Sequence, residues 1–108
     1  MRAALLLLAF LVLLAARALA GPDMVGSWRA SGGYVVTIPG GTGSFQLVFE
    51  LQGERITHPA VWVKPGHEFT WTDKQGASHQ ATWSSQQDRI EDVNSAWPGS
   101  PAYWYRVR

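Results

Sequence analysis

The three histidines of the chain, His58, His67 and His79, are the residues whose type most directly suggests metal chemistry, because neutral imidazole is a common metal ligand. None forms an H-x-H or H-x₃-H pair with another. If the segment between the last two folds as a hairpin, His79 lies opposite Trp71 or Asp73, and His67 lies roughly 13 to 20 Å away at about 3.4 Å per residue. The ligands of one metal lie much closer together. The spacing therefore predicts no metal site, and three histidines satisfied by hydrogen bonds at the edge of the core.

The only concentration of acidic side chains is Asp88, Glu91 and Asp92, followed by Asn94. Paired carboxylates serve acid-base chemistry or hold hard cations, but this spacing lacks the alternating ligands and central glycine of a calcium loop. The sequence also has no G-x-S-x-G, H-E-x-x-H or phosphate-binding glycine loop. Because acidic side chains are mostly exposed, we expect a solvated turn and strand edge. We predict no catalytic residue and no cofactor, and an enzyme that uses these carboxylates or a histidine is the third alternative.

Six tryptophans in 108 residues are the other conspicuous chemical feature. A small domain buries a modest fraction of its surface and needs large apolar side chains, all the more when it has no cysteine to form a disulfide. Aromatic residues are therefore expected in the core first. The alternation of side chains assigns Trp71 and Trp83 to the core face of one hairpin.

Three further tryptophans are candidates for contact with a ligand: Trp62, Trp97 and Trp104. The first and last face away from the apolar residues beside them in their strands, and Trp97 lies in a turn that contains prolines. An exposed indole stacks well on an apolar ring face such as that of a sugar. We predict that these three are ligand-binding residues. The competing interpretation is that a curled sheet buries part of both faces and gives them structural roles.

Residues 1–20 have the three parts of a secretory signal: a basic start at Arg2, a run of fourteen apolar residues, and a small-residue end at Ala18 to Ala20. The run is shorter than the roughly 20 residues that span a bilayer, so a retained anchor is only the alternative. We therefore predict an exported mature domain, residues 21–108, in a periplasm or outside the cell, with no transmembrane segment.

The charge balance of this domain excludes a nucleic-acid footprint. Of nine basic residues, Arg2 and Arg17 lie in the predicted signal, which leaves seven against eight acidic residues. No basic patch for a nucleic acid or an anionic membrane is present in that composition.

Short apolar stretches recur every 8 to 12 residues between glycine, proline and polar clusters, which is typical of an all-β sandwich or barrel. The predicted strands are 25–30, 34–38, 44–52, 57–64, 68–72, 78–84, 88–93 and 102–108. Their short connections favour antiparallel neighbours. The sequence thus predicts a small up-and-down meander of 7 to 8 short strands that curls into a closed or half-closed barrel, because closure removes exposed edges.

The clearest local prediction is the hairpin of residues 66–84. Its odd positions carry His67, Phe69 and Trp71 on one arm and His79, Ala81 and Trp83 on the other. A turn near residue 75 brings odd residues opposite odd residues, so both arms agree on which face is apolar.

The segment "GSWRASGGYVVTI", residues 26–38, resembles the first-strand G-x-W signature of calycin barrels, the group of lipocalins and avidins. "SHQATWS", residues 78–84, likewise looks like a tryptophan-bearing avidin strand. The resemblance implies a barrel in which Trp28 packs under an arginine of the last strand, Arg106 or Arg108. On this basis Trp28 and Arg106 join Trp71 and Trp83 as structural residues.

These observations favour an exported, non-enzymatic binding module that takes a small apolar or sugar-like ligand at its open end or aromatic rim. The alternative is an envelope or extracellular protein in which the same tryptophans contact another protein or serve a structural role.

Overall fold

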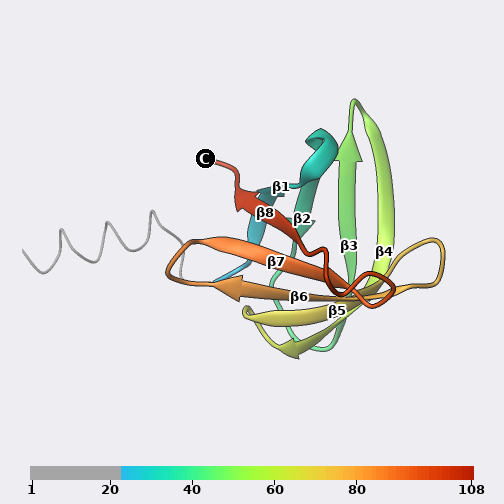
Figure 1. Ribbon diagram of the computed structural model, residues 1–108. Coiled ribbons are helices and arrows are strands. Elements are labelled where there is room, and N and C mark those ends of the chain that lie inside the picture. The colour runs from blue at the N-terminus through green and yellow to red at the C-terminus, as the bar shows by residue number, and fades with distance from the viewer. Residues whose placement is uncertain (1–22) are drawn as a thin grey trace, which may run out of the picture.

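The computed structural model describes residues 23–108, which form eight antiparallel strands closed into one barrel (Figure 1). Each strand pairs with the next along the chain, and the last pairs back with the first. The strands are β1 (Gly26–Arg29), β2 (Val35–Ile38), β3 (Ser44–Leu51), β4 (Glu54–Lys64), β5 (Glu68–Thr72), β6 (Ser78–Ser84), β7 (Arg89–Asn94) and β8 (Ala102–Arg106). A 3₁₀ turn, η1 (Ser31–Gly33), connects the first two. The predicted all-β up-and-down meander is confirmed, and the barrel is closed.

The predicted signal of residues 1–20 lies outside the described residues. Within residues 23–108, no helix is long and apolar enough to cross a bilayer.

The β5–β6 hairpin has one of the two predicted registers, and the predicted inner face is confirmed for residues 69–83 but is wrong for His67. Trp71 pairs with His79, and Phe69 pairs with Ala81. All four are buried, while His67, just before β5, is exposed. The alternation of residues 69–83 therefore contributes one wall of the core, as the sequence indicated.

The expectation that Trp62 and Trp104 stand exposed is wrong. Their side chains keep only 7% and 2% of their surface, whereas Val61 and Tyr105 beside them remain about half exposed. The alternation in β4 and β8 is as predicted, but the tryptophan face is the inner one. An indole removes far more apolar area from water than a valine, and a tyrosine retains a hydroxyl group that water can bind.

One end of the barrel is closed by side chains around Trp28, which is fully buried. Its Nε1 donates to the carbonyl oxygen of Met24 at 2.9 Å, and the Arg106 guanidinium lies 4.4 Å from the centre of its ring. Arg106 also donates to both carboxylate oxygens of Asp88, at 2.8 and 2.9 Å, and to the carbonyl oxygen of Asp23. The contact implied by the calycin resemblance is thus present, and Arg106 makes it rather than Arg108.

The other end of the barrel is open because two ladders stop short of it. β4 pairs with β5 only from Ala60 onward, directly after Pro59, which has no N–H to donate. The far half of β4 pairs with β3 alone, and this hairpin rises past the rest of the sheet (Figure 1). β1 and β8 share only the pairs at Trp28 and Arg29.

We expect Arg106→Ala to lower the free energy of unfolding by about 2–4 kcal/mol, because it removes the guanidinium from Trp28 and leaves the Asp88 carboxylate without its main partner. The matched control is Arg108→Ala, whose side chain is largely exposed and reaches Asp88 at only 3.3 Å; it should change stability by less than about 0.5 kcal/mol. Urea unfolding of the two variants measures both values. Equal losses in the two variants would show that the barrel does not depend on this contact.

Candidate functional site

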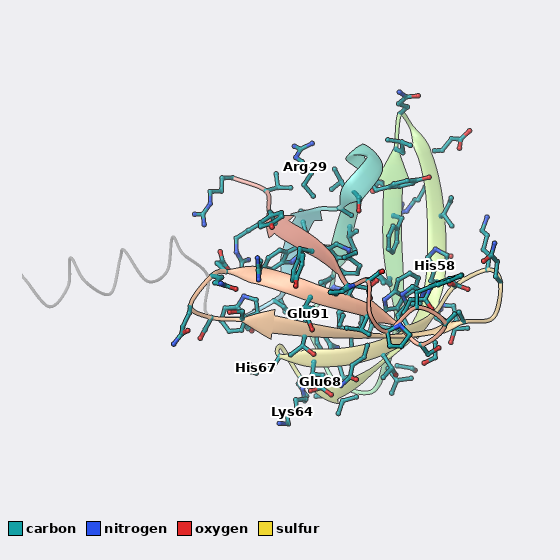
Figure 2. All side chains as sticks on the ribbon, viewed as in Figure 1. Arg29, His58, Lys64, His67, Glu68 and Glu91 are labelled. Atoms are coloured by element: carbon teal, nitrogen blue, oxygen red, sulfur yellow. The ribbon has the colours of Figure 1, made fainter. Side chains whose placement is uncertain are left out.

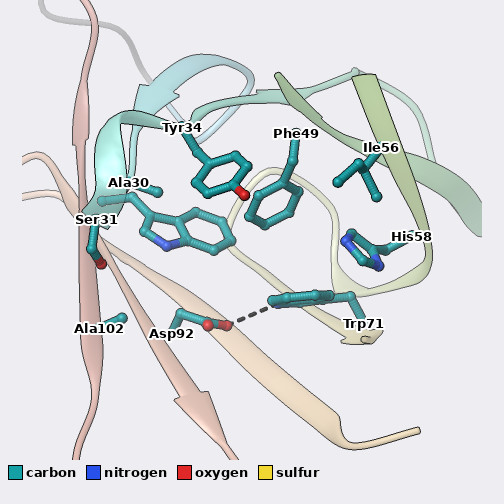
Figure 3. Close-up of a pocket in the computed structure, with 10 residues that line it drawn as sticks. Ala30, Ser31, Tyr34, Phe49, Ile56, His58, Trp71, Asp92 and Ala102 are labelled. Atoms are coloured by element: carbon teal, nitrogen blue, oxygen red, sulfur yellow. Dashed lines mark hydrogen bonds between the residues drawn. The ribbon is translucent and has the colours of Figure 1, made fainter. Parts of the chain in front are cut away.

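A cavity of about 300 Å³ lies inside the open end of the barrel (Figure 3). Its wall is assembled from the η1 segment, the β3–β4 hairpin, β5, β7 and the start of β8. The ten described residues that line it are Ala30, Ser31, Tyr34, Phe49, Ile56, His58, Trp71, Asp92, Ala102 and Trp104. The volume lies at the small end of the range of ligand pockets.

Four aromatic rings form most of the wall, contributed by Tyr34, Phe49, Trp71 and Trp104. The Phe49 ring is central, 5.3 Å from Trp71, 5.8 Å from Trp104 and 6.0 Å from Tyr34, measured between ring centres. Its plane is inclined to these three by 42°, 90° and 69°. Inclined rings surround a volume from several sides, whereas parallel rings would leave only a flat slot. The arrangement therefore suits a rounded apolar group.

Asp92 places a carboxyl group in this aromatic wall, although its side chain is buried and only 6% exposed. Its Oδ1 accepts a hydrogen bond from Trp71 Nε1 at 2.8 Å, which Figure 3 shows across the cavity floor. Its Oδ2 lies 3.0 Å from His79 Nδ1. The imidazole of His79 also stacks on Trp71, with 3.9 Å between the ring centres.

His79 is held between two carboxyl groups, because its Nε2 lies 2.8 Å from Asp73 Oδ2. A neutral imidazole has one N–H, so both contacts are hydrogen bonds only if the ring is protonated or one carboxyl group is. Burial raises the pKa of Asp92. By contrast, hydrogen bonds from His79 and from the backbone hold the pKa of Asp73 below its usual value. Asp73 therefore stays ionised at neutral pH, whereas burial favours the protonated form of Asp92.

His58 lies on the other side of Trp71, with 5.1 Å between the ring centres. Burial and the nearby Lys74 lower the pKa of His58, so its imidazole is neutral at pH 7. Its ring thus adds a polar edge to the cavity without adding a positive charge.

The three histidines lie at separate places in the barrel. His79 lies opposite Trp71, one of the two positions that the hairpin register predicted. His67 packs near Trp83, away from His58, whose side chain lies on β4 (Figure 2). In residues 23–108 no group of three or more histidine, aspartate or glutamate side chains is arranged to hold a metal ion.

The predicted ligand-binding tryptophans are not brought together. Trp104 lines the cavity from within, Trp62 is buried without lining it, and Trp97 is 70% exposed in the turn between β7 and β8. Trp71, which we assigned a purely structural role, also lines the cavity. The two tryptophans at this site, Trp71 and Trp104, form part of the cavity wall and do not project into solvent.

The expectation of a solvated acidic turn is wrong for Asp88 and Asp92. Asp88 is partly buried against Arg106 and also accepts from Trp83 Nε1, so that its pKa is lowered, chiefly by the Arg106 hydrogen bonds. Asp92 points inward because its parity in β7 matches Ile90, which is fully buried. The spacing of Ile90 and Asp92 was the available signal, since residues two apart in a strand share a face.

Comparisons with protein-family models, with curated proteins and with solved structures found no match to this chain. The relation to calycin barrels therefore stays a prediction from residues 26–38 and 78–84. The function has to be inferred from the cavity itself.

We expect Asp92→Asn to retain the fold, because the amide oxygen can accept from Trp71 and the amide nitrogen can donate to a neutral His79. Leucine has a similar size but cannot form hydrogen bonds, so Asp92→Leu leaves Trp71 Nε1 and His79 Nδ1 without their partner. It should lower the free energy of unfolding by about 2–4 kcal/mol. Chemical denaturation distinguishes the two variants. If the free energy of unfolding falls by the same amount in both variants, the fold requires the carboxyl group itself, and the hydrogen bonds that an amide can also form are not sufficient.

The same pair tests the raised pKa of Asp92. Folding raises the pKa of Asp92 above its value in the unfolded chain, which is near 3.8. The carboxyl group therefore contributes to stability at pH values below 3.8, and this contribution is lost as the pH rises through the pKa of the folded state. The stability of Asp92→Asn relative to the native chain should therefore increase as the pH rises above about 4. A difference that does not vary with pH would contradict the shift.

Proposed function

We propose that this chain is an exported, non-enzymatic binding module whose ligand is small and presents apolar faces, as an alkyl group or a sugar ring does. The observation that carries the proposal is the cavity enclosed by Tyr34, Phe49, Trp71 and Trp104 at the open end. Buried aromatic walls with a few polar groups are typical of small-ligand sites. Because the opposite end is sealed by Arg106 and Trp28, a ligand is expected to enter from one side only.

The hydrogen bonds of Asp92 favour binding over acid-base catalysis. Both of its oxygens already have nitrogen partners, in Trp71 and His79. Among the described residues, no serine, threonine or tyrosine hydroxyl group is hydrogen-bonded to Asp92 or to His79, so neither activates a nucleophile. These contacts hold the Asp92 carboxyl group in one position, which supports a role in recognition.

The cavity can be filled from its own wall to test this proposal. Ala102 lines it from β8, and Ala102→Phe should occupy the space that a ligand needs. The native chain is titrated with apolar probes and glycans while its tryptophan emission, to which Trp71 and Trp104 contribute, is recorded. We expect a probe that changes the emission of the native chain to bind Ala102→Phe at least about tenfold more weakly, the effect of losing roughly 1.4 kcal/mol of contact.

The control for this titration is Val61→Phe, which adds the same ring on the exposed outer face of β4. It should bind like the native chain. If no apolar probe or glycan alters the emission of the folded native protein, the proposed function fails.

One observation favours the alternative of an extracellular or envelope protein partner: Trp97 exposes most of its indole in the turn after β7. Exposed tryptophans are frequent hot spots of interfaces. If the chain associates with itself or with a partner through this turn, Trp97→Ala should weaken the association by at least about tenfold, or 1.4 kcal/mol, and leave the thermal midpoint unchanged. Sedimentation velocity measures the association. Unchanged association of the variant would exclude this turn as the contact.

A further inference from the structure

The charge of the cavity wall is one-sided. Asp92 is the only one of the ten lining residues with a carboxyl group, and none of the ten is a lysine or an arginine. The remaining titratable base in the wall, His58, is kept neutral by burial. An anionic ligand would find no cationic partner among these residues, while a cationic one would find Asp92.

Asp92 lies in the cavity wall, whereas Asp73, on the far side of the His79 ring, does not line the cavity. A cation in the cavity therefore favours the ionised form of Asp92, because a nearby opposite charge stabilises a carboxylate.

We infer that the cavity binds a small organic ammonium ion whose nitrogen carries alkyl groups. This inference rests on the proposed function and names the ligand class of the same cavity. Aromatic faces attract such a cation through their quadrupole, and the attraction is strongest where water is excluded. Four rings inclined to one another and one buried carboxyl group supply both parts of that recognition.

The engaged oxygens of Asp92 distinguish this ligand from other cations. An inorganic ion needs several oxygen ligands, and a primary ammonium ion needs acceptors for three N–H groups. Asp92 Oδ1 accepts from Trp71 and Oδ2 already has His79 as a partner, so the carboxylate offers charge but fewer free lone pairs than an unpartnered one. A fully alkylated nitrogen has no N–H and requires only the charge and the rings.

The inference is tested with two probes that differ in one atom. Choline has a trimethylammonium group, and 3,3-dimethylbutan-1-ol has the same shape with a neutral carbon in place of the nitrogen. Isothermal titration of the native protein should show choline binding at least about tenfold more tightly than the alcohol, since a desolvated cation–π site favours the charge to that extent or more. Equal affinities for the two probes would overturn the inference and leave the proposed function in place.

Two isosteric variants test which carboxyl group gives the cavity its preference for choline. Asp92→Asn should abolish the preference for choline, so that both probes bind within about twofold of each other. Asp73→Asn removes a carboxylate from the same network outside the cavity wall and leaves the Asp92 carboxyl group in the wall. It should keep the preference. Loss of the preference in Asp73→Asn but not in Asp92→Asn would overturn the assignment.

A third variant tests the rings without changing charge. Phe49→Leu keeps an apolar side chain at the centre of the wall but removes a ring face. Choline affinity should fall by about threefold to tenfold, the range of one exposed to partly buried cation–π contact. The affinity for the alcohol should fall by less than that for choline, and equal losses would count against cation recognition by the rings. If neither probe binds the native protein and no apolar compound or glycan does, the proposed function fails together with the inference.

Discussion

The stacking of Arg106 on Trp28 joins the last strand of the barrel to the first, and the interior depends on this junction. The ladder between β1 and β8 has only two residue pairs, so backbone hydrogen bonds alone hold the seam weakly. The guanidinium adds a cation–π contact on one side and two charge-assisted hydrogen bonds to Asp88 on the other. One side chain thus binds the first strand, the last strand and the β6–β7 turn.

The two ends of the barrel use carboxylates in opposite ways. At the closed end, Asp88 faces a permanent cation and its pKa falls, so the pair is a fixed structural element. At the open end, Asp92 faces indole and imidazole donors in a buried setting and its pKa rises. A buried carboxyl group without a permanent counter-ion is costly in a small domain. Asp92 has no arginine or lysine among its hydrogen-bond partners, and this is the feature that the proposed cationic ligand would match.

Much of the fold could be predicted from the sequence because strand alternation and turn chemistry are local properties. The limits of β5 and β6 follow from residues 66–84 alone, and this segment narrows the partner of His79 to Trp71 or Asp73, of which the structure has Trp71. The inner faces of β4 and β8 could not be read in the same way, since Trp62 and Trp104 alternate with residues that are also apolar. Tyr34, Phe49 and Asp92 come close together only when the eight strands close into a barrel. Their spacing along the chain therefore could not predict that they line one cavity.

Pro59 marks the point in β4 at which pairing with β5 ends, so one part of the cavity wall is hydrogen-bonded to the sheet along a single edge. Beyond it, the strand that carries Ile56 and His58 is hydrogen-bonded on one edge only, to β3, while the β5–β7 side is a continuous ladder. Regions with unpaired backbone edges open locally at lower free energy than a fully paired sheet. Local opening of the β3–β4 hairpin therefore costs less free energy than opening the fully paired β5–β7 side, and it leaves the pairing of β1 with β8 intact.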